Sequence, residues 1–548
     1  MLGGIRDRRL AAAVHDAAAR WDAEDGTRRL FARDASLWTS GDEACWLGWL
    51  DPAESGAGLD DWTRLADEAR DGFSDVLVLG MGGSSLWPLV IARTFGRTKG
   101  RPALRVLDST DPAEVLAAER SVDLARTLVL VASKSGSTLE PVLFMERLLA
   151  SVSDVVGSAE AARRFIAITD PGSNLEREAT KRGFRAIVPG IPGIGGRFSA
   201  LSAFGMLPAA LCGAPAAGIL ASARRMASAC RAEPAASNPG ALLGCTLGAL
   251  AREGRDKITV VASQGIAAIG GWIEQLVAES TGKRGMGLIP VDGEVLGAPG
   301  VYGEDRVFVA MILASDADAE RDRRLEALAL AGHPVLHIDV PDAADLGAVA
   351  YQWEVATAVA GSILRLHPFD QPDVEAAKIA SRALMDAWER TGRLPDDAKE
   401  ARRDPVDMRA HLARIMPGDY FAVLAFTPET ERIVAALQRL RHAVRDSRRV
   451  ATCLGFGPRF LHSTGQLHKG GPATGIFLQI TCDDAEACAV PGRPYGFSVV
   501  KAAQAAGDRQ VLEGRGRRIL HVHVGRDVEA GIERLAADVV SACEGGQP

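Results

Sequence analysis

The 548-residue sequence predicts an α/β protein with two doubly wound parallel-sheet domains, each a three-layer αβα sandwich, and a smaller C-terminal α/β module. Short apolar segments rich in β-branched residues alternate with segments of helical length, as expected for buried parallel strands joined by crossover helices. The alternation occurs in two successive blocks, and the chain is too long for one hydrophobic core. We therefore expect a helical covering segment at 1–72, domains at 73–215 and 216–395, and a module at 405–548.

The expected elements follow in that order along the chain. Amphipathic helices interrupted by Gly and Pro fill the N-terminal segment. In the first block, strands are expected at 74–79, 103–107, 127–132 and 165–169, and helices at 86–95 and 139–150. In the second block, strands at 257–262, 306–310 and 334–338 precede helices at 347–365 and 372–390. A polar linker at 394–409 is followed by strands at 419–426, 475–481 and 519–524 and a helix at 429–444.

Composition excludes several classes of protein. The chain is 47% hydrophobic and 24% charged, which is typical of an ordered globular protein, and its net charge of −7 argues against binding nucleic acid or an anionic membrane. We find no signal peptide and no apolar run long enough to span a bilayer. The eight cysteines are scattered without a C-x-x-C pair, which favours a reducing compartment and offers no zinc site. A soluble, cytoplasmic protein is expected.

The segment Ser133-Lys-Ser-Gly-Ser-Thr138 is the most informative in the chain. It follows an apolar strand and precedes a helix, so its hydroxyl groups and backbone N–H groups lie at a helix N-terminus, where an anion is favoured. Candidate phosphate ligands are therefore Ser133, Lys134, Ser135, Ser137 and Thr138. An ordinary polar turn with a serine N-cap is the alternative.

A glycine-rich loop, Gly80-Met-Gly-Gly-Ser-Ser85, follows the first strand. It can be read as a dinucleotide-binding fingerprint with Asp108 as the ribose-binding acid, but the third glycine of that motif would fall at Ser85. Adjacent glycines followed by hydroxyls, with Gly83 and Ser84 at the centre, better suit a smaller phosphorylated or polyhydroxylated ligand. A tight turn without a ligand is the remaining interpretation.

Candidate catalytic groups come from two other segments. Gln275 and Glu279 lie at positions i and i+4 of an expected helix, and Glu279 is near its C-terminus, where a carboxylate is electrostatically disfavoured. Glu279 is therefore a candidate general base. Arg197 follows the glycine-rich turn Gly193-Ile-Gly-Gly196 and is suited to stabilising a developing oxyanion. Each residue could instead be an ordinary surface charge.

Two later segments add polar candidates. Gln371 is expected in a loop and Lys378 two turns into the following helix. The segment 457–471 is dense in glycine and contains His462 and His468, both of which we place in a loop rather than on an apolar core face.

Together these segments resemble phosphoglucose isomerase, a family built from two sugar-isomerase (SIS) domains. Gly80–Ser85 resembles the family's G-x-G-G-S loop, and Ser133–Thr138 its S-K-S/T-x-x-T phosphate loop. The other matches are G-G-R-[YF]-S at 195–199, Q-x-x-x-E-S-x-G-K at 275–283 and F-D-Q-x-x-V-E-x-x-K at 369–378. The resemblance spans about residues 70 to 380. The segment R-F-L-H-S-T-G-Q-L-H-K-G-G at 459–471 is similar to the isomerase half of transaldolase/phosphoglucose isomerase fusions.

The resemblance implies a role for each matched residue. The sugar phosphate would be held by Ser84, Ser133, Lys134, Ser135 and Thr138. Glu279 would transfer a proton between C1 and C2 through a cis-enediolate, with Arg197 stabilising its charge. Lys378 would assist ring opening, and Gln275 and Gln371 would line the site. The resemblance implies no metal and no redox cofactor, because the substrate's hydroxyl and carbonyl groups exchange oxidation level.

The chain departs from the family at the histidine that opens the sugar ring. The family carries it shortly after the glutamate motif, in the form H-x-x-x-Q-x-x-x-x-G, but here no histidine lies between Glu279 and Arg323. Residues 462–471 fit that form, so we expect His462 to be the displaced acid/base, with His468 as the competing candidate. In family dimers this histidine comes from the partner subunit. The resemblance thus implies a homodimer, whereas His462 acting in cis would complete the site within a monomer.

The expected activity is the interconversion of glucose 6-phosphate and fructose 6-phosphate. The sequence leaves three alternatives open: a dual phosphoglucose/phosphomannose isomerase, a non-catalytic SIS sensor of sugar phosphates, and an NAD-dependent dehydrogenase. A sensor needs only the phosphate loop, so the presence of Glu279, Arg197 and Lys378 argues against it. Whether the chain is complete or belongs to a transaldolase fusion is also open.

Overall fold

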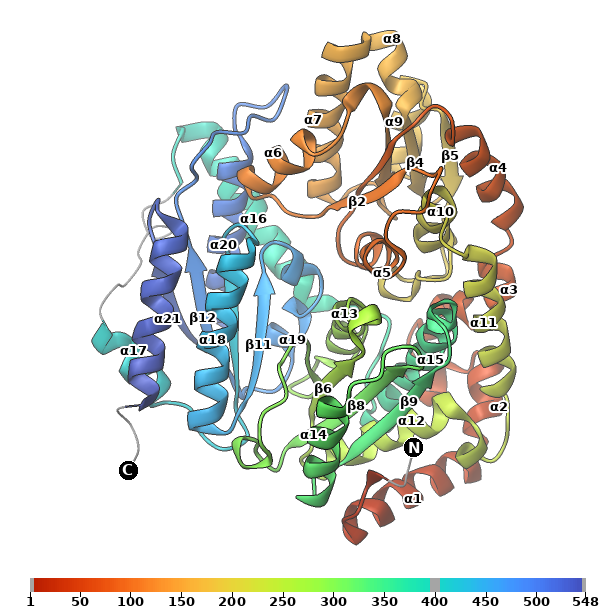
Figure 1. The fold of residues 1–548 in the computed structure, drawn as a ribbon, viewed down its shortest axis with the longest axis vertical. Helices are drawn as coiled ribbons and strands as arrows, with labels where there is room; N and C mark the ends of the chain where they lie inside the picture. Colours follow the sequence, from red (N-terminus) through yellow and green to blue (C-terminus); the bar gives the residue numbers. More distant parts are fainter. Residues whose placement is uncertain (1–3, 395–404, 545–548) are drawn as a thin grey trace.

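Three parallel β-sheets form the framework of the protein, as seen in a computed structural model that describes residues 4–394 and 405–544 (Figure 1). The strand orders are β2-β1-β3-β4-β5, β7-β6-β8-β9 and β11-β10-β12-β13. Every strand pair in these sheets is parallel. The predicted α/β class is therefore confirmed, with helices flanking each sheet (Figure 1).

The first sheet is buried on both faces. Its strands are β1 (Asp75–Leu79), β2 (Ala103–Leu107), β3 (Thr127–Ala132), β4 (Phe165–Thr169) and β5 (Ala186–Pro189). Val76 and Val78 of β1 belong to one hydrophobic cluster and Leu77 and Leu79 to another, because alternate side chains point to opposite faces. The surrounding helices are α4 (Leu59–Ala69), α5 (Leu86–Phe95), α6 (Pro112–Arg120), α7 (Leu139–Val156), α8 (Ser158–Ala161), α9 (Asn174–Arg182) and α10 (Ala203–Cys212).

The second sheet repeats this plan with four strands. They are β6 (Lys257–Ala262), β7 (Ile289–Val291), β8 (Arg306–Leu313) and β9 (Val335–Val340). The associated helices are α11 (Ala216–Ala229), α12 (Pro239–Arg252), α13 (Ile269–Thr281), α14 (Ala319–Leu330), α15 (Leu346–Leu364) and α16 (Pro372–Thr391). Gly244 and Gly248 let α12 approach α15 closely, since a Cβ at Gly244 would lie 2.5 Å from the carbonyl oxygen of Ala356.

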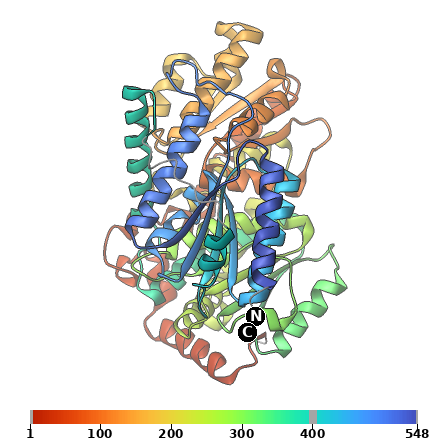
Figure 2. The ribbon, with the colours of Figure 1, turned by 90° about the vertical axis from the view of Figure 1, so that its left-hand side faces the viewer.

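The C-terminal sheet lies between two helical layers (Figure 2). Its strands are β10 (Tyr420–Phe426), β11 (Ala451–Phe456), β12 (Gly475–Thr481) and β13 (Arg518–His523). Helices α17 (Pro405–Leu412), α18 (Glu431–Arg448) and α21 (Val528–Glu544) pack on the face that contains Phe421 and Val423, and α20 (Phe497–Gly514) packs on the face that contains Tyr420 and Leu424. The short α19 (Gly465–Gly470) links this module to α13 and α16.

The N-terminal segment consists of short helices, as expected. These include α1 (Arg8–Ala23), α2 (Gly26–Phe31) and α3 (Pro52–Ser55), which pack with α4 against the first two domains. The expected linker at 394–409 lies partly outside the described residues, and its last part is wrong because α17 begins at Pro405. No helix within 4–394 and 405–544 combines the length and apolar character needed to cross a membrane.

All three sheets have a topological switch point, where successive connections leave a central strand in opposite directions. In the first sheet it lies between β1 and β3. Open α/β sheets bind ligands outside the carboxyl ends of the strands at such a point. The loops that follow β1 and β3 are 80–85 and 133–138, so the fold brings the two predicted ligand loops together.

Candidate active site

In the glycine-rich loop 80–85, two glycines allow three other segments to approach closely. Gly82 has a φ of 57°, and a Cβ there would lie 2.8 Å from Nε2 of Gln275 and 2.9 Å from the carbonyl oxygen of His462. A Cβ at Gly83 would lie 2.0 Å from the carbonyl oxygen of Gly196. Side chains at either position would push Gln275, His462 or the Arg197 loop away. The glycines therefore allow both domains and the C-terminal module to meet at one point.

Ser85 occupies the position of the third glycine in the dinucleotide-binding fingerprint. Ser85 is buried, and its hydroxyl donates to the carbonyl oxygen of Gly82 at 3.1 Å. Ser84 is also buried, in the 3₁₀ turn Gly82–Ser84. The loop is folded onto itself in a way that differs from the dinucleotide fingerprint, in which a third glycine packs helix against strand.

The phosphate loop connects β3 to α7. Ser135, Ser137 and Thr138 line a cavity of about 180 Å³ together with Lys378 and His462. The Oγ atoms of Ser135 and Ser137 are 2.8 Å apart, and the N-terminus of α7 follows directly. The structure thus brings hydroxyls, a helix N-terminus and a lysine around one small space, which suits a phosphate group.

Three expected phosphate ligands, Ser84, Ser133 and Lys134, do not line this cavity. The Lys134 ammonium is paired with the Asp170 carboxylate and also donates to the carbonyl oxygens of Ile191 and Pro192, at 3.2 and 3.0 Å. Ser133 is buried at the end of β3. Neither side chain lines the cavity described above. In this structure Lys134 anchors the turn that leads to Arg197.

Glu279 is held between a cation and an amide near the end of α13. Its Oε1 lies 3.2 Å from Nη1 of Arg197, and its Oε2 accepts a hydrogen bond from Nε2 of Gln275 at 3.1 Å. The second bond confirms that positions i and i+4 face the same way. Arg197 and Gln275 are both 3% exposed, so these contacts are shielded from water. The carboxylate is thereby fixed in position rather than solvated at the surface.

Arg197 is fixed by the loop that precedes α16. Its Nη2 donates to the carbonyl oxygens of Pro368 and Asp370 at 2.7 and 2.9 Å, and its Nη1 donates to Oε1 of Gln371 at 3.0 Å. Burial lowers the pKa of Arg197, while the charge of Glu279 opposes this shift. Such a dry, preorganised guanidinium can stabilise negative charge that develops beside Glu279.

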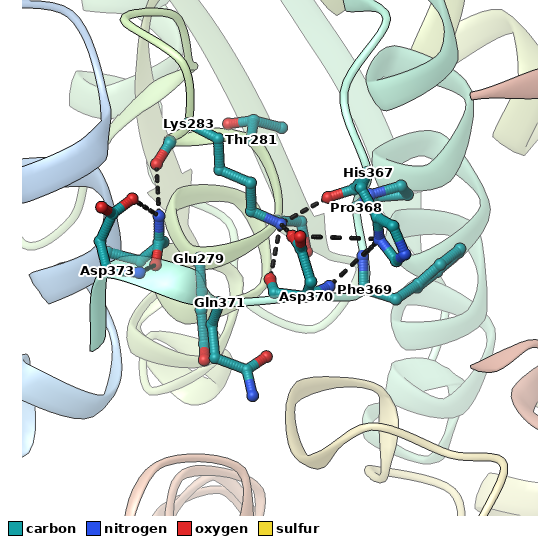
Figure 3. Close-up of polar contacts among 12 residues, drawn as sticks. Glu279, Thr281, Lys283, His367, Pro368, Phe369, Asp370, Gln371 and Asp373 are labelled. Atoms are coloured by element: carbon teal, nitrogen blue, oxygen red, sulfur yellow. Dashed lines mark hydrogen bonds and ion pairs between the residues drawn. The ribbon is translucent and has the colours of Figure 1, made fainter. Parts of the chain in front are cut away.

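Lys283 holds the same loop from the other side (Figure 3). Its Nζ donates to the carbonyl oxygens of His367 and Asp370 at 2.5 and 2.6 Å and to Oδ1 of Asp370 at 2.5 Å. Burial, followed by the charge of Arg197, lowers the pKa of Lys283 to about 7. The 367–371 loop is therefore held between two buried cations.

His462 comes from the C-terminal module and meets a carboxylate of the first domain. Its Nε2 lies 3.0 Å from Oε1 of Glu140, which also accepts from Nε2 of Gln504 at 2.6 Å. Burial alone would raise the pKa of Glu140, but the interactions with His462 outweigh burial and the pKa is lowered. The backbone carbonyl of His462 accepts from Gln275 at 2.7 Å, which connects this pair to Glu279.

His468 does not have the loop position expected from the sequence. It lies in α19, is 2% exposed and stacks on Tyr420, whose hydroxyl is 3.1 Å from its Nδ1. Burial lowers the pKa of His468 well below its usual value. The prediction that His468 lies in a loop was therefore wrong. A neutral histidine in an aromatic core is also not placed to act on a substrate.

Docking of the C-terminal module depends on buried polar contacts with the first domain. Lys501 donates to Oδ2 of Asp111 at 2.8 Å, and both side chains are at most 5% exposed. Thr110 donates to Oε1 of Gln504 at 2.7 Å. These contacts hold α20 against α6 and α7, and so hold Gln504 and His462 at Glu140.

Two site residues were missed by sequence reasoning. Glu140 lies in the first turn of α7, where an acidic residue is common for reasons of the helix dipole alone. Gln504 lies in the middle of α20 and belongs to no motif. Only the contacts of Glu140 with both His462 and Gln504 distinguish them.

Comparison with known proteins identifies the family. The family model of phosphoglucose isomerase matches residues 61–304. Glucose-6-phosphate isomerase of Rubrobacter xylanophilus is 30% identical over 370 residues, which are 59% of this chain and 85% of that protein. The enzyme of Parasynechococcus marenigrum is 33% identical over 360 residues, which are 58% of this chain and only 64% of that protein.

Solved structures agree on the fold. A hypothetical protein of Thermus thermophilus aligns with a TM-score of 0.59 and 26% identity, covering 69% of this chain and 99% of that one. A glucose-6-phosphate isomerase of Chlamydia trachomatis aligns with a TM-score of 0.53 and 20% identity, covering 66% of this chain and 78% of that one. The motifs, the strand order and these relatives lead to one conclusion: the chain belongs to the phosphoglucose isomerase family.

Proposed function

We propose that the protein catalyses the reversible isomerisation of glucose 6-phosphate and fructose 6-phosphate. The observation that carries the proposal is the buried carboxylate of Glu279, fixed 3.2 Å from Arg197 and hydrogen-bonded to Gln275. Moving a proton between C1 and C2 of a sugar requires a base that reaches both carbons and a cation for the enediolate oxygen. We assign the base to Glu279 and the cation to Arg197.

Substrate binding is assigned to the phosphate loop. The hydroxyls of Ser135, Ser137 and Thr138 and the N-terminus of α7 would hold the phosphate group. Gly83 and Ser84 would flank the sugar, and Gln371 would contact it beside Arg197. Lys134, which the resemblance gives a phosphate-binding role, would support the site through the 191–192 turn instead.

Ring opening is assigned to His462 and Lys378, which line the same cavity. His462 would remove the proton from the O1 hydroxyl while Lys378 assists protonation of the ring oxygen, which yields the open-chain aldehyde. Glu140 would keep the imidazole oriented and balance the positive charge that it gains on taking the proton. Glu279 would then take the proton from C2, and Arg197 would hold the enediolate. The proton of the O2 hydroxyl would pass to O1, and the proton on Glu279 would return to C1 to give the ketose.

The complete set of groups lies within one chain, so we infer that His462 acts in cis and that a monomer suffices for catalysis. The test of the overall function is conversion of fructose 6-phosphate to glucose 6-phosphate, followed by a coupled dehydrogenase, for wild type and Glu279→Gln. We expect turnover in wild type and a loss of about 10³-fold or more in the variant, with sugar-phosphate binding retained. Binding without turnover in either protein would contradict the proposal and assign the chain to the sensors.

A further inference from the structure

A second cavity, separate from the one that contains the phosphate loop, lies behind the 367–371 loop. It has a volume of about 590 Å³, which is large enough for a small metabolite. Its basic lining residues are Lys283, Arg284, Lys469, Arg515 and Arg517, and its acidic lining residues are Asp370 and Asp373. This excess of positive charge occurs in a chain whose net charge is −7. We call this cavity the basic pocket.

Carboxylates compensate only some of these charges. Lys283 pairs with Asp370, Lys469 with Asp508, and Arg515 with Asp373. Within the described residues, Arg284 forms no ion pair, and Arg517 donates its Nη2 only to the carbonyl oxygens of Lys469 and Gly471, at 2.6 and 2.7 Å. The Nε of Arg517 is buried without a hydrogen-bond partner among those residues. Among the described residues, the guanidinium groups of Arg284 and Arg517 therefore form no ion pair with a carboxylate, although the charge of Asp373 acts on Arg517.

The basic pocket is mechanically connected to the catalytic arginine. Lys283, on the pocket side, and Arg197, on the site side, donate to the same carbonyl oxygen of Asp370, at 2.6 and 2.9 Å. The next residue, Gln371, accepts from Arg197 at 3.0 Å. Figure 3 shows Lys283, Asp370 and Gln371 along this path. A change in how Lys283 holds the loop must alter the surroundings of Arg197.

We propose that the basic pocket binds a small phosphorylated metabolite that lowers the turnover of the enzyme. Phosphate oxygens match the planar donor fork of arginine, which favours phosphate over a single carboxylate. An anion beside Arg284 and Arg517 attracts the ammonium of Lys283, so it competes with Asp370 for that charge. The 367–371 loop is then held less firmly, and Arg197 loses part of its preorganisation.

Pyrophosphate is the probe, and the first experiment measures binding by calorimetry. The titration is done with an equilibrium mixture of glucose 6-phosphate and fructose 6-phosphate at saturating concentration, so that the substrate site is occupied. We expect one pyrophosphate to bind per wild-type chain, at least tenfold weaker binding to Arg284→Gln, and partial recovery in Arg284→Lys. Arg97→Gln, which removes an exposed loop arginine of the first domain, is the matched control and should bind as wild type does.

Kinetic measurements distinguish inhibition through the basic pocket from competition at the substrate site. Pyrophosphate at the substrate site raises KM only, whereas occupancy of the basic pocket lowers kcat, and we expect at least a twofold fall at constant ionic strength. Arg284→Gln should keep the wild-type kcat without pyrophosphate and should lose this fall. Absence of binding to the substrate-saturated enzyme, equal binding by Arg284→Gln, or binding of citrate but not pyrophosphate would each overturn the proposal. The binding result does not depend on turnover, so it is distinguishable from failure of the isomerase assignment.

Discussion

Nε2 of His462 lies 3.0 Å from Oε1 of Glu140, although the two residues are 322 positions apart in the chain. One belongs to the C-terminal module and the other to the first turn of α7. Gln275 connects this pair to Glu279 within the same chain, because its Nε2 donates both to the backbone carbonyl oxygen of His462 and to Oε2 of Glu279.

Replacing His462 by Asn should lower kcat for glucose 6-phosphate by about 10²-fold or more, since positioned acid/base catalysis contributes that much. The coupled assay measures the loss. His15→Asn, which alters an exposed histidine of α1, is the control and should retain full activity. Full activity of His462→Asn combined with a loss in His468→Phe would contradict our assignment.

Glu140→Gln should lower kcat by about tenfold to a hundredfold while leaving KM within about twofold, because the neutral amide no longer balances the positive charge that His462 gains when it takes a proton. The variant keeps the shape of the side chain and can still accept from Gln504, so its fold should be retained. Circular dichroism and the KM value check this. A fall in affinity without a fall in kcat would mean that Glu140 contacts the substrate instead of positioning His462.

Specific activity should stay constant when the enzyme is diluted from micromolar to nanomolar concentration. The reason is that His462, Lys378, Glu279 and Arg197 come from one chain, so dissociation of any dimer removes no catalytic group. Activity and light scattering are measured on the same dilution series. A loss of activity that parallels dissociation would show that a partner subunit completes the site.

Glu274→Gln should stabilise the protein at alkaline pH only. Burial, and next the charge of Asp292, raise the pKa of Glu274 from 4.5 to about 8. The folded state therefore keeps a proton that the unfolded state releases, and the free energy of unfolding falls as pH rises from 4.5 to about 8. A glutamine at position 274 cannot ionise, so this fall in the free energy of unfolding is absent from the variant.

Urea unfolding tests this expectation. The variant should be more stable than wild type by about 1–3 kcal/mol near pH 9 and no more stable near pH 4. Asp292, whose pKa is raised to about 6 by burial, adds a smaller fall over a lower range of pH in both proteins. Equal unfolding free energies of the two proteins at alkaline pH would contradict the prediction.

Local sequence patterns were sufficient for most of the framework. The β-branched segments at 127–132 and 257–262 form β3 and β6 at the predicted residues. Three strands were not predicted: β5, only four residues long, β7, only three residues long, and β11, which contains Gly455. The domain boundaries stay predictions, as does the link to a transaldolase fusion.

The sequence by itself determined the α/β class, because strand alternation and helical spacing are local properties of a chain. Its motifs also nominated the two ligand loops and the candidates Glu279, Arg197 and Lys378. Only the tertiary structure decided where those side chains point. It turned Lys134 toward Asp170, buried His468 against Tyr420 and brought His462 and Gln504 to Glu140. The place of Gln504 beside Glu140 depends on how α20 docks through Lys501 and Asp111, a contact between segments 390 residues apart that no local pattern encodes.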